Sequence, residues 1–289
     1  MAQKPVGKHG KQSVEQHTQT PRKSPRVSKT ALIVLLVVLL LVAAAGIGFF
    51  AYRQWQISKA EPTETSIEIP SVSVATTSAS VSTPAPEPVK LPDNPVDFAG
   101  LQQNNTDICG WINVPNTEIN YPILRSSDDA AFYLSHDENG EASGPGSIYM
   151  EPANSPKFDD PCTVLYGHDG YGDTMFTTLH YFEDADFFNA NPEFTICIPQ
   201  HILTYRVVSA FMYDNRHILN SFNFNDVATR LQYFSMVSDP DSILVNKRDG
   251  ITLTETSKIV TLSTCMTSAG LNESRYLVTG VLVNDQQTN

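Results

Sequence analysis

Short apolar runs separated by turn residues make up most of the chain after residue 108. Residues 259–264 and 276–283 are rich in β-branched and apolar side chains, which favours strands, and the segment between them contains loop-forming Ser, Gly and Asn. Similar runs predict six more strands, at residues 110–114, 119–124, 147–150, 163–166, 194–199 and 203–213. Many short strands with few crossover helices indicate a mostly antiparallel β-barrel or sandwich.

Helical periodicity is limited to a few segments of the same region. A short amphipathic helix is expected near the start of the folded domain, with Asp93 or Asn94 as its N-cap and Pro95 at its first position. Residues 173–182 and 225–237 also follow a helical pattern, the second with apolar side chains along one face. These helices are too few to alternate with the strands, so the chain is predicted to be mostly β.

Residues 31–52 contain no charged side chain and are dominated by Leu, Val and Ala. As a helix this stretch would be about 33 Å long, enough to cross a bilayer. It is too long and uniformly apolar for a cleaved signal, and residues 46–52 form a poor cleavage site. Seven basic residues and the single acid Glu15 precede it, which places the N-terminus in the cytoplasm. We expect a cytoplasmic tail at 1–30 and a transmembrane helix at 31–52, with a buried core helix as the alternative.

The segment after this helix has a linker composition. Of the 35 residues from 58 to 92, 18 are Pro, Ser or Thr, and none is aromatic. We therefore expect an extracellular linker over 53–94 and one folded domain over 95–289. Beyond residue 30 the chain has 12 basic against 30 acidic residues, a formal charge of about −18. That charge argues against nucleic acid or anionic lipid as the ligand.

All four cysteines lie in the predicted outer part, where disulfides are permitted: Cys109, Cys162, Cys197 and Cys265. Their even number leaves two disulfides open, but a domain of this size does not need them. Cys162 and Cys197 adjoin strand-like runs and are expected to be small buried apolar residues.

Cys265 and Arg275 lie at the two ends of the connection between the last two predicted strands. If those strands are neighbours the two residues face each other, and a nearby positive charge stabilises the thiolate, which is the reactive form. By composition alone Arg275 would be an ordinary surface residue, but beside a thiol its donors suit an oxyanion or a carbonyl. His168 follows the predicted strand at 163–166 through Gly167, so it lies at a strand end as Cys265 does. The pattern makes Cys265 a candidate nucleophile and His168 a candidate for its base, with a structural role for His168 as the alternative.

The other histidines of the outer part lie in helix-like or polar loop segments, where a surface or structural role is expected: His136, His180, His201 and His217. The sequence contains no Cys-x-x-Cys or His-x-x-x-His pair and no glycine-rich phosphate loop. We therefore expect no metal site and no cofactor.

Residues 261–265 (TLSTC), followed by Arg275 ten residues after the cysteine, resemble the active-site motif of sortases, the membrane-anchored cysteine transpeptidases of Gram-positive bacteria. The resemblance spans roughly residues 96–283 and continues at 107–121 (DICGWINVPNTEINY), 133–136 (YLSH), 146–149 (GSIY) and 166–168 (YGH). The leading helix, the long segment after His168 and the helix at 225–237 are most similar to class B. The resemblance implies an eight-stranded sortase β-barrel with an N-terminal helix and a helix between its sixth and seventh strands.

The resemblance also implies roles for individual residues. Cys265 would be the nucleophile, His168 the general acid and base, and Arg275 the group that stabilises the oxyanion and the substrate. Four residues would contact the substrate: Leu134, Tyr166, Ser263 and Thr264. Some class B enzymes have an acid two residues after the cysteine, but that position is Thr267 here.

No fourth, acidic site residue is assigned, because the sequence favours neither Glu273 nor Asp169 for that role. The implied reaction cleaves a Thr-Gly-like or Thr-Asn-like bond in the C-terminal sorting signal of a secreted protein through a thioacyl intermediate. An amine of a peptidoglycan precursor or a pilin lysine then accepts the acyl group. Two alternatives stay open: a noncatalytic extracellular binding module on a stalk, and a cysteine peptidase that only hydrolyses.

Overall fold

The computed structural model describes residues 29–58, 68, 91–265 and 274–289. Helix α1 (Lys29–Ser58) contains the predicted transmembrane segment and extends six residues past its expected end. The span Ile33–Ser58 is long and apolar enough, by length and composition, to cross a membrane. The helix continues past the apolar run because its backbone hydrogen bonds do not require apolar side chains.

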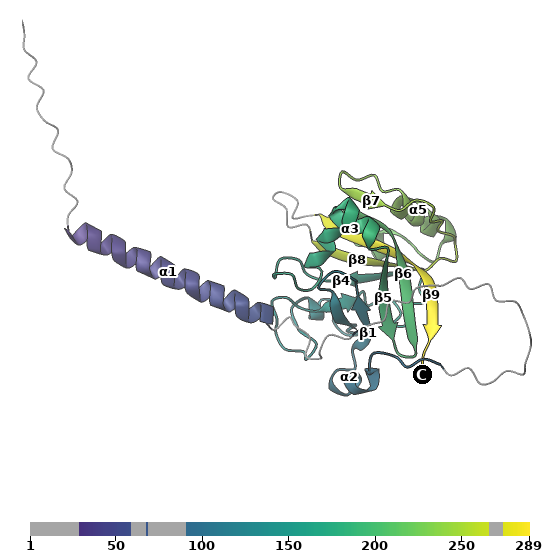
Figure 1. Cartoon of the computed structure of the whole chain (residues 1–289), viewed down its shortest axis with the longest axis horizontal. Helices are drawn as coiled ribbons and strands as arrows, with labels where there is room; N and C mark the ends of the chain where they lie inside the picture. Colours follow the sequence, from purple (N-terminus) through teal and green to yellow (C-terminus); the bar gives the residue numbers. More distant parts are fainter. Residues whose placement is uncertain (1–28, 59–67, 69–90, 266–273) are drawn as a thin grey trace, which may run out of the picture. The chain divides into compact units, whose positions relative to one another are not determined.

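Eight strands close into a barrel in the order β5-β1-β2-β3-β4-β8-β9-β6, because β5 and β6 also pair (Figure 1). Most neighbouring strands are antiparallel, and the parallel pairs are β2–β3 and β4–β8. The predicted eight-stranded, mostly antiparallel barrel is confirmed. Its strands are β1 (Ile108–Asn113), β2 (Asn120–Leu124), β3 (Ile148–Met150), β4 (Cys162–Tyr166), β5 (Glu193–Ile198), β6 (His201–Tyr213), β8 (Ile259–Cys265) and β9 (Arg275–Gln287).

The described helical segments within the folded domain are short: α2 (Phe98–Asn104), η1 (Phe132–Leu134), η2 (Thr177–Glu183), α3 (Ala185–Ala190), α4 (Ile218–Ser221) and α5 (Val227–Ser238). Both α4 and α5 lie between β6 and a further strand, β7 (Val245–Lys247), which confirms the helix expected in that connection. The sequence pattern does not predict β7, because three residues are too few to show a period of two. Figure 1 shows α5 and β7 at one end of the barrel, and α2 beside the C-terminus at the other.

The first helix of the folded domain begins later than expected. Its N-cap is Asp97, whose carboxylate accepts a hydrogen bond from the Gly100 amide, 3.0 Å away. The expected cap Asn94 instead accepts a hydrogen bond from the Val96 amide and donates one to the carbonyl oxygen of Ile198. The asparagine therefore joins the entering chain to β5 rather than starting a helix.

The helix expected at residues 173–182 is also different. Met175 has a left-handed backbone (φ 54°), which ends any regular helix there, and the next seven-residue element, η2, is a 3-10 helix. Asp184 then has an extended backbone and caps α3 by accepting a hydrogen bond from the Phe187 amide. The left-handed residue and the extended cap replace one predicted helix with two short ones.

Strand β8 is buried on both faces, which explains why its apolar residues do not alternate. Val260 and Leu262 point into the barrel core, whereas Ile259 packs in a second cluster with Phe234 and Val237 of α5. Thr261 is also fully buried, and its hydroxyl pairs with that of Thr279 on β9 at 3.2 Å. Strand β8 is therefore buried from Ile259 to Thr264, and its last residue, Cys265, is half-buried.

Candidate active site

Three strand ends meet at one edge of the barrel. Strands β4 and β8 run parallel with Tyr166 opposite Ser263, so β4 ends two residues before β8 does. His168 follows β4 at this edge, and Cys265 ends β8. Strand β9 begins at Arg275, which is directly opposite Cys265 in the antiparallel register. The predicted facing of the cysteine and the arginine is confirmed.

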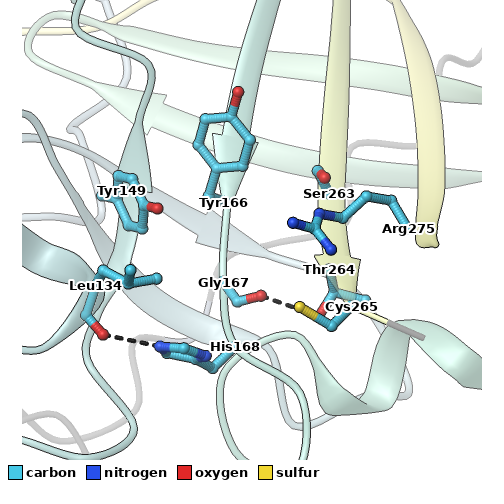
Figure 2. A pocket seen from close by; sticks show the side chains of 9 residues that line it. All are labelled: Leu134, Tyr149, Tyr166, Gly167, His168, Ser263, Thr264, Cys265 and Arg275. Atoms are coloured by element: carbon cyan, nitrogen blue, oxygen red, sulfur yellow. Dashed lines mark hydrogen bonds between the residues drawn. The ribbon is translucent and has the colours of Figure 1, made fainter. Parts of the chain in front are cut away.

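An open pocket lies at this edge and contains all seven residues predicted for the site (Figure 2). Two further residues line it, Tyr149 of β3 and Gly167. Sequence reasoning did not select Tyr149, although it belongs to the GSIY segment that carries part of the resemblance. It lies opposite Tyr166 in the antiparallel β3–β4 pair, with the ring centroids 5.3 Å apart. The two tyrosines form one wall of the pocket.

Cys265 differs from the other cysteines by its position in this pocket. All four cysteines are free, and Cys162 and Cys197 are buried as predicted. Burial raises the pKa of the Cys109 and Cys197 thiols to about 12, and it raises that of Cys162 as well. These three stay in the unreactive thiol form at neutral pH, whereas Cys265 is half-buried beside a histidine and an arginine.

His168 is oriented by the backbone of Leu134. Its Nε2 lies 2.8 Å from the Leu134 carbonyl oxygen, which can only accept a hydrogen bond, so Nε2 carries a proton. In the neutral ring the free lone pair is therefore on Nδ1, and Figure 2 shows this nitrogen on the side of Cys265. The Leu134 carbonyl thus selects the tautomer in which Nδ1 is available for proton transfer.

Arg275 reaches the pocket with its guanidinium. Among the described residues its hydrogen bond is a long one, 3.4 Å from Nη1 to the Ser274 carbonyl oxygen. Burial and the charge of Glu151 raise the pKa of Tyr149 to about 12, and the Arg275 guanidinium opposes that rise. Tyr149 therefore stays a neutral phenol at working pH, and the guanidinium can donate to an anionic group in the pocket.

Thr264 connects the two segments that carry His168 and Cys265. Its hydroxyl donates to the Gly167 carbonyl oxygen at 2.9 Å, and the Gly167 amide donates to the Ser263 carbonyl oxygen at 3.2 Å. Thr264 is only 2% exposed and Ser263 only 4%. Both residues line the pocket, but the Thr264 hydroxyl is already used to hold the two segments together.

A family comparison agrees with this geometry. The sortase domain model matches residues 112–283, well over half of the chain.

The chain belongs to the sortase family.

Three class B relatives illustrate the match. Sortase B of Listeria monocytogenes is 31% identical over 193 residues, which cover 65% of this chain and 74% of that protein. The crystal structure of Staphylococcus aureus sortase B has a TM-score of 0.58 at 26% identity and covers 67% of this chain and 89% of that one. A Streptococcus pyogenes class B sortase involved in pilus biogenesis has a TM-score of 0.55 at 28% identity, and the match covers 65% of this chain and 98% of that one. This sortase is a cysteine transpeptidase most similar to class B.

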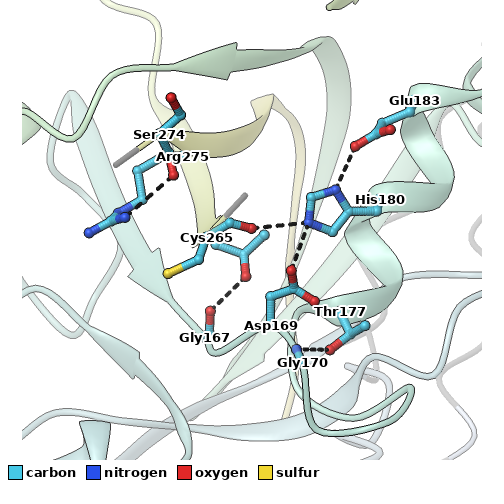
Figure 3. A network of polar contacts seen from close by, with 10 residues as sticks. Gly167, Asp169, Gly170, Thr177, His180, Glu183, Cys265, Ser274 and Arg275 are labelled. Atoms are coloured by element: carbon cyan, nitrogen blue, oxygen red, sulfur yellow. Dashed lines mark hydrogen bonds and ion pairs between the residues drawn. The ribbon is translucent and has the colours of Figure 1, made fainter. Parts of the chain in front are cut away.

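Sequence reasoning placed His180 outside the site, and the structure places it against Cys265. Its Nε2 lies 3.1 Å from the Cys265 carbonyl oxygen and 3.4 Å from Oδ2 of Asp169, and its Nδ1 lies 2.6 Å from Oε1 of Glu183 (Figure 3). The ring stacks on Tyr276, with the centroids 5.0 Å apart. The sequence offers no local signal for this cluster, because it joins three separate segments of the chain.

Thr267, which stands where some class B enzymes have an acid, and Glu273 lie outside the described residues. Asp169, the other acid considered, pairs with His180. In the part of the chain that the structure describes, no three His, Cys, Asp or Glu side chains are arranged to hold a metal ion.

We expect Gly167→Ala to destabilise the fold by about 1–3 kcal/mol, because overpacked cores cost that much. A Cβ at Gly167 would lie 2.5 Å from Cδ1 of Ile148 and 2.7 Å from Cγ of Phe176. Urea unfolding of the full chain in detergent measures the loss. Adding Ile148→Val removes the closest atom, so a double-mutant cycle should show favourable coupling between the two substitutions. Additive effects would contradict the steric explanation.

The stability that His180 contributes should depend on pH. Burial alone lowers the pKa of this histidine, but Asp169, Glu183 and the Cys265 carbonyl outweigh burial and raise the pKa from 6.5 to about 9. A raised pKa stabilises the fold fully below pH 6.5 and loses that effect as pH rises through 9. The wild type should therefore exceed His180→Gln in free energy of unfolding by about 1–2 kcal/mol more at pH 6 than at pH 10. A pH-independent difference in urea unfolding would refute this charge state.

Proposed function

We propose that Cys265, His168 and Arg275 carry out transpeptidation on C-terminal sorting signals of secreted proteins. The observation that supports this most is that the ends of three strands bring a thiol, an imidazole and a guanidinium to one open pocket. This combination supplies a nucleophile, a proton carrier and an oxyanion donor, which acyl transfer requires.

The reaction has two halves. The Cys265 thiolate attacks the scissile carbonyl carbon, and Arg275 donates hydrogen bonds to the oxygen that becomes negative. The C–N bond then breaks, His168 gives its Nδ1 proton to the departing amine, and a thioester remains on Cys265. In the second half an acceptor amine attacks the thioester, neutral His168 takes a proton from that amine at Nδ1, and the thiolate leaves. The Leu134 carbonyl keeps Nε2 protonated through both halves.

The pocket wall supports binding of an extended peptide. Leu134 is 43% exposed and lines the pocket together with Tyr149 and Tyr166. These side chains would contact the sorting signal through apolar surface, and the neutral Tyr149 phenol could hydrogen-bond to its backbone. Ser263 contributes a nearly buried floor. We propose that the scissile bond is of the Thr-Gly or Thr-Asn kind.

The acceptor is an amine outside the cell. The positive N-terminal tail and the apolar span of α1 support a single-pass protein with its N-terminus in the cytoplasm and residues 53–94 as an extracellular linker. The catalytic domain, residues 95–289, would then meet secreted proteins on the outer side. Peptidoglycan precursors and pilin lysines both offer primary amines there, and the Streptococcus pyogenes relative is involved in pilus biogenesis.

Product analysis tests this function. The full chain in detergent is incubated with peptides that contain a Thr-Gly or a Thr-Asn bond, with and without an amine such as triglycine or a lysine peptide. A transpeptidase gives an amide product that requires the added amine and appears by mass spectrometry. The same free acid with and without amine would indicate a peptidase that only hydrolyses. No cleavage of any peptide would support the binding module.

A further inference from the structure

A single short element, η2, contacts the backbone of both proposed catalytic residues. The amide of its N-cap residue, Phe176, donates to the carbonyl oxygen of His168, 3.1 Å away. One turn later His180 reaches the carbonyl oxygen of Cys265 at 3.1 Å. The nucleophile and the proton carrier lie at the ends of different strands, so these hydrogen bonds to one element fix the position of each backbone relative to the other.

The His180 ring also joins the two segments directly. Its Nε2–H donates to the Cys265 carbonyl oxygen, and the same nitrogen lies 3.4 Å from Oδ2 of Asp169, the residue after His168, as an ion pair. The Asp169 side chain is only 3% exposed, and that of His180 is 22% exposed. The contact is thus largely shielded from water. A charged hydrogen bond in such a buried place is stronger than one at the surface.

Within the described parts of the chain, the groups that face the imidazole favour its charged form. Asp169 from the loop after β4, Glu183 from η2 and the Cys265 carbonyl from β8 are all acceptors, and Tyr276 of β9 offers its ring face. Both ring nitrogens face acceptors, so both need a proton. Hydrogen bonding and the two carboxylates raise the pKa of His180 to about 9, which keeps the ring protonated at neutral pH.

We propose that His180 is a positioning residue that holds the backbone of Cys265 in register with His168 and neutralises the two carboxylates that pair with its ring. This inference rests on the proposed function of Cys265 and His168. Figure 3 shows the Cys265 sulfur pointing away from His180 while the carbonyl points toward it, and His180 does not line the pocket. It therefore acts through Cys265 rather than by touching the substrate.

The contacts of His180 have two separable effects. Hydrogen bonding to the Cys265 carbonyl limits movement of the last residue of β8, and small displacements of a nucleophile are costly to catalysis. The imidazolium also compensates the negative charge of Asp169 and Glu183. Without it, two uncompensated carboxylates would remain around the group that contacts the Cys265 backbone, and their negative charge would disfavour the thiolate.

The test uses the full chain in detergent with His180→Gln and His180→Ala. Iodoacetamide alkylation of Cys265, located by peptide mass spectrometry, is followed against pH, and peptide transfer is measured in the same preparations. We expect kcat to fall about tenfold in His180→Gln and further in His180→Ala, with KM changed less than about threefold. The alkylation midpoint should rise by about 0.5–1 pH unit. Adding Asp169→Asn to His180→Gln removes one uncompensated charge and should move the midpoint back.

His201→Gln is the matched control, because His201 also pairs with a carboxylate, that of Asp285 at 2.6 Å. His201 begins β6, whereas Arg275 of the pocket is opposite Tyr213 at the far end of that strand. It should leave kcat and the alkylation midpoint unchanged. A merely structural role for His180 would lower the active fraction without moving the midpoint, so an unshifted midpoint in His180→Gln overturns the proposal. Failure of the proposed function looks different: transfer would then survive Cys265→Ala.

Discussion

Replacement of Cys265 by alanine should abolish peptide transfer by the full chain. The expected loss is on the order of 10⁴-fold or more, because no thioester can form without the sulfur and no other group in the pocket replaces it. Cys265 is the cysteine that lines the pocket, with His168 and Arg275 around it. Transfer from a fluorescent sorting peptide to an amine, followed by liquid chromatography, measures the effect. A thiol-directed peptide analogue should also stop labelling the protein.

Cys109→Ala provides the matched control. This thiol is also free and half-buried, but it lies in β1, and its sulfur is 3.5 Å from the Ile123 carbonyl oxygen. Burial raises its pKa to about 12, so it is protonated at neutral pH. The control variant should retain transfer and labelling. If Cys265→Ala kept its labelling, the peptide analogue would be reacting elsewhere and the enzymatic interpretation of the pocket would be wrong.

Much of this site could be predicted from sequence because it depends on strand ends. The runs at 259–264 and 276–283 are strands in a hairpin, and the two residues flanking a hairpin connection must face each other, as Cys265 and Arg275 do. His168 required one more step, namely that β4 neighbours β8. The apolar run of β8 is consistent with that, because a strand covered on both faces loses its alternation.

The supporting residues could not be predicted in the same way. His180 reaches Cys265 only because Met175 turns the chain through a left-handed conformation and the following residues wind as a 3-10 helix. A regular helix over 173–182 would have aimed residue 180 differently. Tyr149 was missed for a related reason: its place in the pocket follows from the β3–β4 register, not from its own sequence context. Side-chain direction after an irregular turn depends on local dihedral angles that a periodic pattern does not contain.

Substitution of Arg275 should produce the second largest loss of activity. We expect kcat/KM for transfer to fall on the order of 10²-fold in Arg275→Lys and about 10³-fold in Arg275→Ala, the range seen when an oxyanion donor is removed. Lysine keeps the charge but not the planar fork, which can hold an oxygen with two donors. Most of the loss should appear in kcat, because the negative oxygen exists only in the transition state. Steady-state kinetics with the fluorescent peptide separate kcat from KM.

Arg206→Lys is the matched control, since Arg206 lies on β6 and pairs with Glu193 of β5 at 2.6 Å. This partly exposed pair should contribute little, and transfer should change by less than about twofold. An Arg275→Lys variant with raised KM and unchanged kcat would instead assign the guanidinium to ground-state binding of the sorting peptide. Full activity in Arg275→Ala would remove the arginine from the mechanism. Its position opposite Cys265 in the β8–β9 register would then be explained by strand pairing alone.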